Sequence, residues 1–186
     1  MVNTKQALGL ALRQGQHVLL ALFGGLPEAN FFSGSAERWS PAQHLDHLTR
    51  ANLPVARVLG LPRLALAAFG GTQHRPSRSF ESLRADYRAA LAAGGRASGR
   101  YLPDLGTRTQ VQLLEDFAAV SEQLNGAFTR WGEADLDRHQ LPHPLLGPLT
   151  VRELLFFTLY HNGHHSEGVR ARAGVPSLGT VERSRS

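Results

Sequence analysis

Apolar side chains recur at helical spacing in four segments of this chain, and each segment carries its own start and stop signals. The first helix is predicted at residues 4–23, because one stripe of this segment is apolar and a pair of glycines follows it. The second is predicted at residues 40–59, where Ser40, Pro41 and Gln43 provide a capped start. Pro54 lies inside this segment, so we expect the helix to kink or to end early there.

The third and fourth segments each begin with a capping box. Thr109 and Gln112 mark the start of the third helix, and apolar residues then recur at helical spacing as far as Trp131. Thr150 and Glu153 mark the start of the fourth helix in the same way. We expect this last helix to continue to about residue 172. The stop signals that follow it are Gly174 and Pro176.

A long connection separates the second helix from the third. Within it, residues 79–93 predict one further helix that ends at a glycine pair. No segment shows the sustained alternation of a strand, so the sequence predicts an all-α four-helix bundle with one long crossover between helices 2 and 3. We expect a single domain over residues 1–176 and a flexible C-terminal tail over residues 177–186.

The composition is that of a globular protein, and it limits the available chemistry. Apolar residues make up 42% of the chain, charged residues 19%, and cysteine is absent. The protein therefore has no disulfide and no cysteine thiolate of its own to act as a nucleophile, and any metal must be held by histidine or carboxylate side chains. The N-terminus has no signal-peptide pattern, and the longest apolar run is too short to span a bilayer. We therefore expect a cytoplasmic protein that has no membrane partner.

The net charge of +5 lies entirely in the middle of the chain. Residues 61–110 contain eight arginines and three acidic residues, whereas the rest of the chain has twelve charges of each sign. A basic surface of this kind attracts anions, although a solvated, arginine-rich loop explains the pattern equally well. Aromatic residues are sparse here and no helix-turn-helix or zinc-finger pattern is present, so nucleic acid is disfavoured as a partner.

Five of the nine histidines fall in two of the predicted helices. His44 and His47 lie in the first turns of the second helix, and His161, His164 and His165 lie in the fourth. Residues four apart share one helix face, so His161 and His165 can direct a ring nitrogen at the same metal ion. A catalytic site normally needs a third ligand, for which His47 is the best candidate and His44 the substitute. Alternatively, these are partly buried histidines bonded to backbone or water.

Three stretches of the sequence resemble the DinB/YfiT-like superfamily. Residues 39–48 read WSPAQHLDHL and resemble the family's W-S…H-L signature. Residues 147–154 read GPLTVREL and resemble the entry to its last helix. Residues 160–165 read YHNGHH and resemble its terminal H-x-x-x-H. The stretches stand in the family's order, and the resemblance covers most of the chain.

The resemblance implies a bundle with up-down-down-up connectivity and allows a homodimer. It also implies a divalent metal ion, zinc or nickel, held by His47, His161 and His165. Residues beside the metal, or alternative ligands, would then be His44, His164 and Tyr160. Three neutral imidazoles leave the metal its full charge and an open coordination position.

The resembling family includes thiol S-transferases that use bacillithiol or mycothiol. The leading hypothesis is therefore a metal-dependent transferase that activates an anionic, low-molecular-weight thiol toward a small-molecule substrate. The arginines of residues 61–110 suit the carboxylates of such a thiol. One alternative is a metal-dependent hydrolase, although spacing places none of its candidate bases, Asp46, Glu153 and Glu167, beside the histidines. Another is a non-enzymatic, metal-stabilised binding or stress-response bundle.

The remaining aromatic and histidine residues are assigned to packing or to no role. Trp39 is expected to pack against the start of the second helix. The aromatic residues expected in the core are Phe117, Phe128, Trp131, Phe156 and Phe157. The histidines without an assigned role are His17, His74, His139 and His143.

Overall fold

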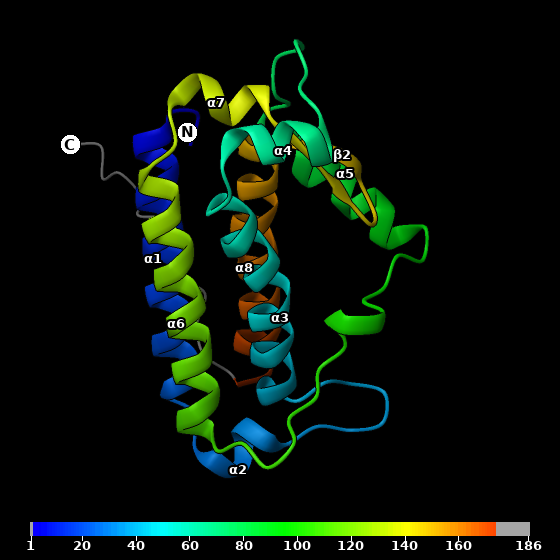
Figure 1. Ribbon diagram of the computed structural model, residues 1–186. Coiled ribbons are helices and arrows are strands. Elements are labelled where there is room, and N and C mark those ends of the chain that lie inside the picture. The colour runs from blue at the N-terminus through cyan, green and yellow to red at the C-terminus, as the bar shows by residue number, and fades with distance from the viewer. Residues whose placement is uncertain (1, 174–186) are drawn as a thin grey trace, which may run out of the picture.

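The computed structural model describes residues 2–173, and four long helices form its centre (Figure 1). They are α1 (Lys5–Gly24), α3 (Pro41–Leu59), α6 (Gln110–Thr129) and α8 (Val151–Ala173). Helices α1 and α8 run in one direction and α3 and α6 in the other, which confirms the predicted all-α bundle with up-down-down-up connectivity. The expected stop signals Gly174 and Pro176 and the expected tail lie outside the described residues.

The long helices begin at the capping residues that the sequence predicts. At α3, Ser40 accepts a hydrogen bond from the backbone N–H of Gln43, and the Gln43 side chain accepts one from the backbone N–H of Ser40. At α8, the backbone N–H of Thr150 donates to Glu153 at 2.9 Å, and that of Glu153 donates to the Thr150 hydroxyl at 3.0 Å. The residues that form the same box at α6 are Thr109 and Gln112.

Pro54 does not end α3. The helix continues from Pro41 to Leu59 with Pro54 inside it, which confirms the predicted range of residues 40–59 and rules out the alternative of an early end. Val55, Ala56 and Leu59, which follow the proline, are all buried in the core. Packing of these side chains holds the last turns in place and outweighs the loss of one backbone hydrogen bond.

Two apolar clusters fill the interior of the bundle, and a polar layer separates them. One cluster adjoins α7 (Glu133–Arg138) and includes Trp131, while the other adjoins α2 (Glu28–Phe32) and includes Phe31. Four of the aromatic residues expected in the core are buried: Phe117, Phe128, Trp131 and Phe156. Between the clusters each long helix places polar side chains in the interior, among them Gln16, Asn52, Ser121 and Asn162.

The crossover between α3 and α6 lies along the side of the bundle that α3 and α8 form (Figure 1). It contains α4 (Arg63–Gly70), α5 (Phe80–Ala92) and the 3-10 turn η1 (Gly99–Tyr101). The helix predicted at residues 79–93 is confirmed as α5, which packs on α8, while η1 packs on α3. The crossover therefore covers the two helices that carry the clustered histidines.

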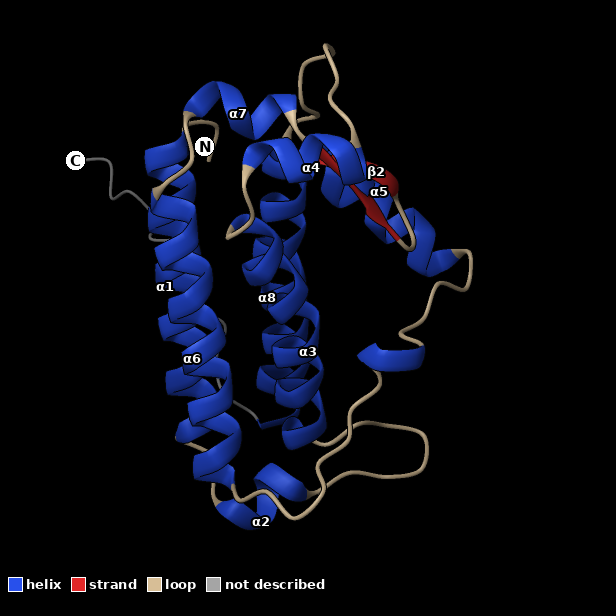
Figure 2. Cartoon of the chain, viewed as in Figure 1, coloured by secondary structure: helices blue, strands red, loops and turns tan. Residues whose placement is uncertain are grey.

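A short antiparallel hairpin follows α7, and the expectation of a chain without strands is wrong in this place (Figure 2). Its strands are β1 (Gln140–His143) and β2 (Gly147–Thr150). Strands of four residues that each contain a proline carry no alternating pattern. Packing from outside positions the hairpin instead, because α4 lies against β1 so closely that a side chain at Gly70 would collide with the backbone of Gln140.

No single helix within residues 2–173 is long and apolar enough to cross a membrane. By length and composition alone, α3 and α4 taken together would be long and apolar enough, but the two helices are bent by 118° relative to each other. The apolar residues of α3 lie mostly in the bundle core, which accounts for its composition.

Candidate metal centre

Histidines from α3 and α8 meet on the side of the bundle that the crossover covers. His47 from α3 and His161 and His165 from α8 each offer one ring nitrogen, and these atoms all lie within 4.8 Å of one another. His161 and His165 stand one turn apart on the same helix face. Leu45 and Leu48 are fully buried and anchor α3 in the core on either side of His47. This group of three could hold a metal ion.

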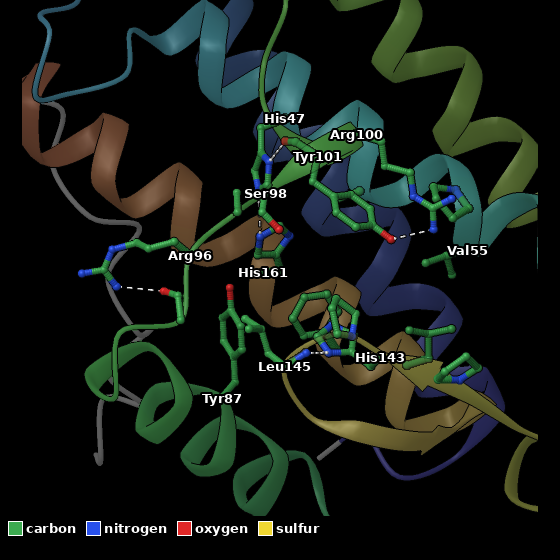
Figure 3. Close-up of a pocket in the computed structure, with 18 of the residues that line it drawn as sticks. His47, Val55, Tyr87, Arg96, Ser98, Arg100, Tyr101, His143, Leu145 and His161 are labelled. Atoms are coloured by element: carbon green, nitrogen blue, oxygen red, sulfur yellow. Dashed lines mark hydrogen bonds between the residues drawn. The ribbon is translucent and has the colours of Figure 1, made fainter.

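The three rings present the same nitrogen, Nε2, to one another. Nε2 of His161 lies 3.2 Å from Nε2 of His47 and 3.1 Å from Nε2 of His165. Nδ1 of His47 donates to the backbone carbonyl of Tyr101 at 2.7 Å, so Nε2 of the neutral ring keeps a lone pair that points at the other two (Figure 3). Converging imidazole lone pairs are ligands that zinc and nickel accept, so the donor set fits such an ion.

Burial keeps the histidines of this group neutral. It lowers the pKa of His161 and of His165 well below the ordinary value, and neighbouring histidines lower both further. Burial also lowers the pKa of His47, although the Tyr101 carbonyl and Asp46 act in the opposite direction. Neutral imidazole is the form that binds metal, so at neutral pH the group is in its binding form.

His44 lies beside the group of three. Its Nδ1 is 2.7 Å from Nδ1 of His165, and its Nε2 accepts a hydrogen bond from Arg172 at 2.7 Å. Burial, and after it the charge of Arg172, lowers the pKa of His44 to about 4. His44 therefore contacts the outer edge of the His165 ring, opposite the converging nitrogens.

His164 and Tyr160 are also close to the group, and neither belongs to it. His164 is exposed, and its ring packs against the rings of Tyr160 and His165. Tyr160 is half-buried, and its ring meets that of Tyr87 edge-on. The structure thus places both residues next to the three converging nitrogens without adding a fourth nitrogen to them.

Two aromatic residues that the sequence assigned to packing lie against the histidines. Trp39 stacks on His165 with 13° between the ring planes, and its ring centroid is 5.0 Å from that of His47. Phe157 packs against the core as expected, but it is only half-buried and it also stacks on His161 at 5.0 Å. The available signal was its position four residues before His161, which puts both rings on one face of α8.

A cavity of about 1000 Å³ opens onto the three histidines (Figure 3). Much of its wall is apolar and comes from α3, α5, α8 and the hairpin, with members that include Val55, Val58, Leu91, Leu141, Leu154 and Phe157. Most of the lining residues from the crossover and the hairpin escaped the sequence analysis, because these two segments contain no motif. They become lining residues only by folding over α3 and α8.

Five arginines of the crossover either attach it to the bundle or line the cavity. Arg75 and Arg78 form ion pairs with the buried Glu153, and Arg108 forms one with the buried Asp46. These pairs attach the crossover to α8 and α3. Two others line the cavity and have no carboxylate partner within residues 2–173, namely Arg96 and Arg100.

In this four-helix bundle, α3 and α8 bring three histidines together beneath a long crossover. This arrangement defines a metal-associated class of four-helix bundle. The sequence profile of the DinB superfamily matches residues 11–167, and the chain belongs to this superfamily, as its motifs predict. The chain is also similar to the uncharacterized protein YuaE of Bacillus subtilis (strain 168). The two are 28% identical over 131 residues, which cover 70% of this chain and 75% of YuaE. No solved structure matches the chain.

Proposed function

We propose that this protein is a metal-dependent transferase that activates a low-molecular-weight thiol. His47, His161 and His165 would hold the metal, for which zinc and nickel suit the donor set best. A divalent ion in this place would favour the thiolate form of a thiol, which is its nucleophilic form. The observation that carries the proposal is the convergence of three Nε2 atoms at a cavity large enough for a thiol and a second small molecule.

Residues around the histidines would have separate tasks in this reaction. The Tyr101 carbonyl orients the ring of His47 and thereby leaves its Nε2 free of a proton. Trp39 and Phe157 pack against the histidine rings and restrict access of water to them. Arg96 and Arg100 line the cavity, where they would pair with carboxylates of an anionic thiol such as bacillithiol or mycothiol.

The geometry supports a metal-dependent hydrolase less well. Of the three acids weighed as general bases, Asp46 and Glu153 are buried, and each is paired with two arginines. Glu167 is exposed on α8. None of the three lines the cavity, so none is placed to accept a proton from water near the histidines.

Metal content and thiol-dependent turnover together test the proposal. We expect the protein, loaded with zinc or nickel, to consume chlorodinitrobenzene in the presence of bacillithiol or mycothiol. His161→Ala should lose this activity and weaken metal affinity by more than about 100-fold, because removing even an outer partner of a ligand costs 10–100-fold. His17→Ala is the matched control, since it removes an exposed histidine from α1 and should change neither result.

Two other outcomes would contradict the proposal. Tight metal binding with no turnover under any thiol would support the non-enzymatic bundle. Ester hydrolysis that needs the metal and no thiol would support the hydrolase.

A further inference from the structure

Two hydrogen-bond donors on the cavity wall stand apart from the group of three histidines. They are Tyr87 of α5 and His143 of β1. Both rings contact the ring of Phe157, with centroid distances of 5.0 and 4.3 Å. Phe157 in turn stacks on His161. The two donors and one histidine of the group therefore share a single aromatic neighbour.

The backbone decides which nitrogen of His143 carries the proton. The N–H groups of Leu145 and Leu146 both donate to Nδ1, each at 3.2 Å, and Figure 3 shows the bond from Leu145. A neutral imidazole that accepts hydrogen bonds at Nδ1 carries its proton on Nε2. Burial keeps the ring neutral, because it lowers the pKa of His143 to about 4. Within residues 2–173 the hydrogen bonds of this ring are the two at Nδ1, so His143, which lines the cavity, presents a fixed N–H donor at Nε2.

Tyr87 presents the second donor. Its ring meets that of His161 edge-on at 6.0 Å, and its hydroxyl points toward the histidines in Figure 3. A tyrosine hydroxyl carries its proton at neutral pH, so it can donate a hydrogen bond. The part of the chain that the structure describes gives this hydroxyl no hydrogen-bond partner.

We infer that Tyr87 and His143 form a donor site for the carbonyl oxygen of an apolar ketone, which in the proposed reaction is the α,β-unsaturated electrophile. The part of this inference that concerns the addition of a thiol rests on the proposed function. The part that concerns binding of the ketone rests on the cavity alone. Both donors are neutral and stand in an apolar wall, which suits a neutral oxygen. A carboxylate would instead lie with Arg96 and Arg100, where charge meets charge.

The reaction would add the thiolate to the β-carbon of the ketone. The sulfur lone pair forms the S–C bond, and the π pair of the C=C bond shifts so that negative charge gathers on the ketone oxygen. The α-carbon then takes a proton from water, which replaces the proton that the thiol released to solvent. Paired donors at that oxygen stabilise the transition state more than the ground state, because the charge develops there.

Ligand binding tests the donor site without any turnover. Metal-loaded protein is titrated with acetophenone and with ethylbenzene, which has a similar apolar body and no oxygen. We expect Tyr87→Phe to weaken acetophenone binding by roughly three- to tenfold, the worth of one neutral hydrogen bond, and to leave ethylbenzene binding unchanged. Equal acetophenone affinity in the wild type, Tyr87→Phe and His143→Leu would overturn the inference.

His143 has a conservative variant that separates hydrogen bonding from packing. In His143→Gln, the side-chain oxygen can accept from the Leu145 and Leu146 N–H groups while the amide N–H₂ donates into the cavity. We therefore expect His143→Gln to retain most of the acetophenone affinity that His143→Leu loses. Equal losses in both variants would assign His143 to loop structure and overturn its part in the site.

Turnover separates this inference from the proposed function. With thiol present, Tyr87→Phe should slow the addition to benzylideneacetone by roughly tenfold and leave the reaction of benzyl bromide, which has no oxygen, unchanged. If neither electrophile reacts with the wild type, the proposed function fails, and the acetophenone titration still decides the donor site. If both react and Tyr87→Phe slows neither, or slows both equally, the inference is overturned and the proposed function stands.

Discussion

At the residue scale, Glu153 combines helix capping with attachment of the crossover. Its fully buried carboxylate accepts from the backbone N–H of Thr150 and forms ion pairs with Arg75 and Arg78. Burial alone would raise the pKa of Glu153, but the hydrogen bonds from the two arginines and from the backbone lower it to about 2. The stability of the fold should therefore depend on the ionised form of this one side chain.

Acid should remove the contribution of Glu153. Its pKa in the folded protein is about 2, below the ordinary 4.5, so its contribution is fully present above pH 4.5 and is lost as the pH falls toward 2. By linkage, the lowered pKa of Glu153 corresponds to about 3 kcal/mol of stability at neutral pH. Denaturant unfolding of the wild type and Glu153→Gln across this range measures the difference in unfolding free energy, which should shrink with falling pH. A difference independent of pH would contradict this account.

At the scale of elements, Asp46 ties the end of the crossover to α3. Its carboxylate is 1% exposed and accepts from Arg50, Arg108 and the backbone N–H of Asp104, at 2.8, 2.7 and 2.7 Å. Asp104 follows closely after η1, and η1 brings the Tyr101 carbonyl to Nδ1 of His47. A residue that faces away from the histidines thus positions one of their partners.

Loss of the Asp46 carboxylate should loosen this part of the crossover. We expect Asp46→Ala to lower the unfolding free energy by about 2–3 kcal/mol, because the buried carboxylate is the shared acceptor of three hydrogen bonds. Limited proteolysis should then cut residues 94–109 faster, and metal affinity should fall by roughly tenfold. Asp116→Ala is the matched control, since this carboxylate also pairs with Arg108 but is 47% exposed and should matter by less than about 1 kcal/mol. Equal effects of the two substitutions would contradict this assignment.

At the scale of the whole molecule, the candidate metal centre joins two helices that run in opposite directions. His47 lies near the start of α3, His161 lies at the middle of α8, and His165 lies one turn further along. An ion held by all three would bind the folded chain and not the unfolded one, so its binding free energy would add to stability.

Metal should therefore raise the melting temperature. With free zinc or nickel about 1,000-fold above its Kd, the added stability is about 4 kcal/mol. For a chain of this length, that corresponds to roughly 8–16 °C. Calorimetry of metal-free and metal-loaded protein measures the shift, which should vanish in His161→Ala and persist in His17→Ala. A similar shift in His161→Ala would point to metal binding elsewhere on the chain.

Local rules were enough for the helices and for part of the candidate site. The capping boxes at Ser40, Thr109 and Thr150 depend on residues three positions apart, so the sequence alone predicts where the long helices begin. The spacing of His161 and His165 is local in the same sense. Bringing His47 to them required a contact between distant helices, so the sequence could name His47 only as the best candidate for a third ligand, with His44 as its substitute.

Contacts between distant segments decided the rest. The hairpin was not expected from local patterns, and α3 continues past Pro54 to its predicted end, because packing between elements outweighs local preference. Tyr87 and His143 belong to elements far apart in the chain and carry no motif. Both nevertheless line the cavity and contact the ring of Phe157. The cavity wall is assembled by burying the apolar surfaces of distant elements against each other. Such contacts produce no periodic pattern in the sequence, so the sequence alone could not predict them.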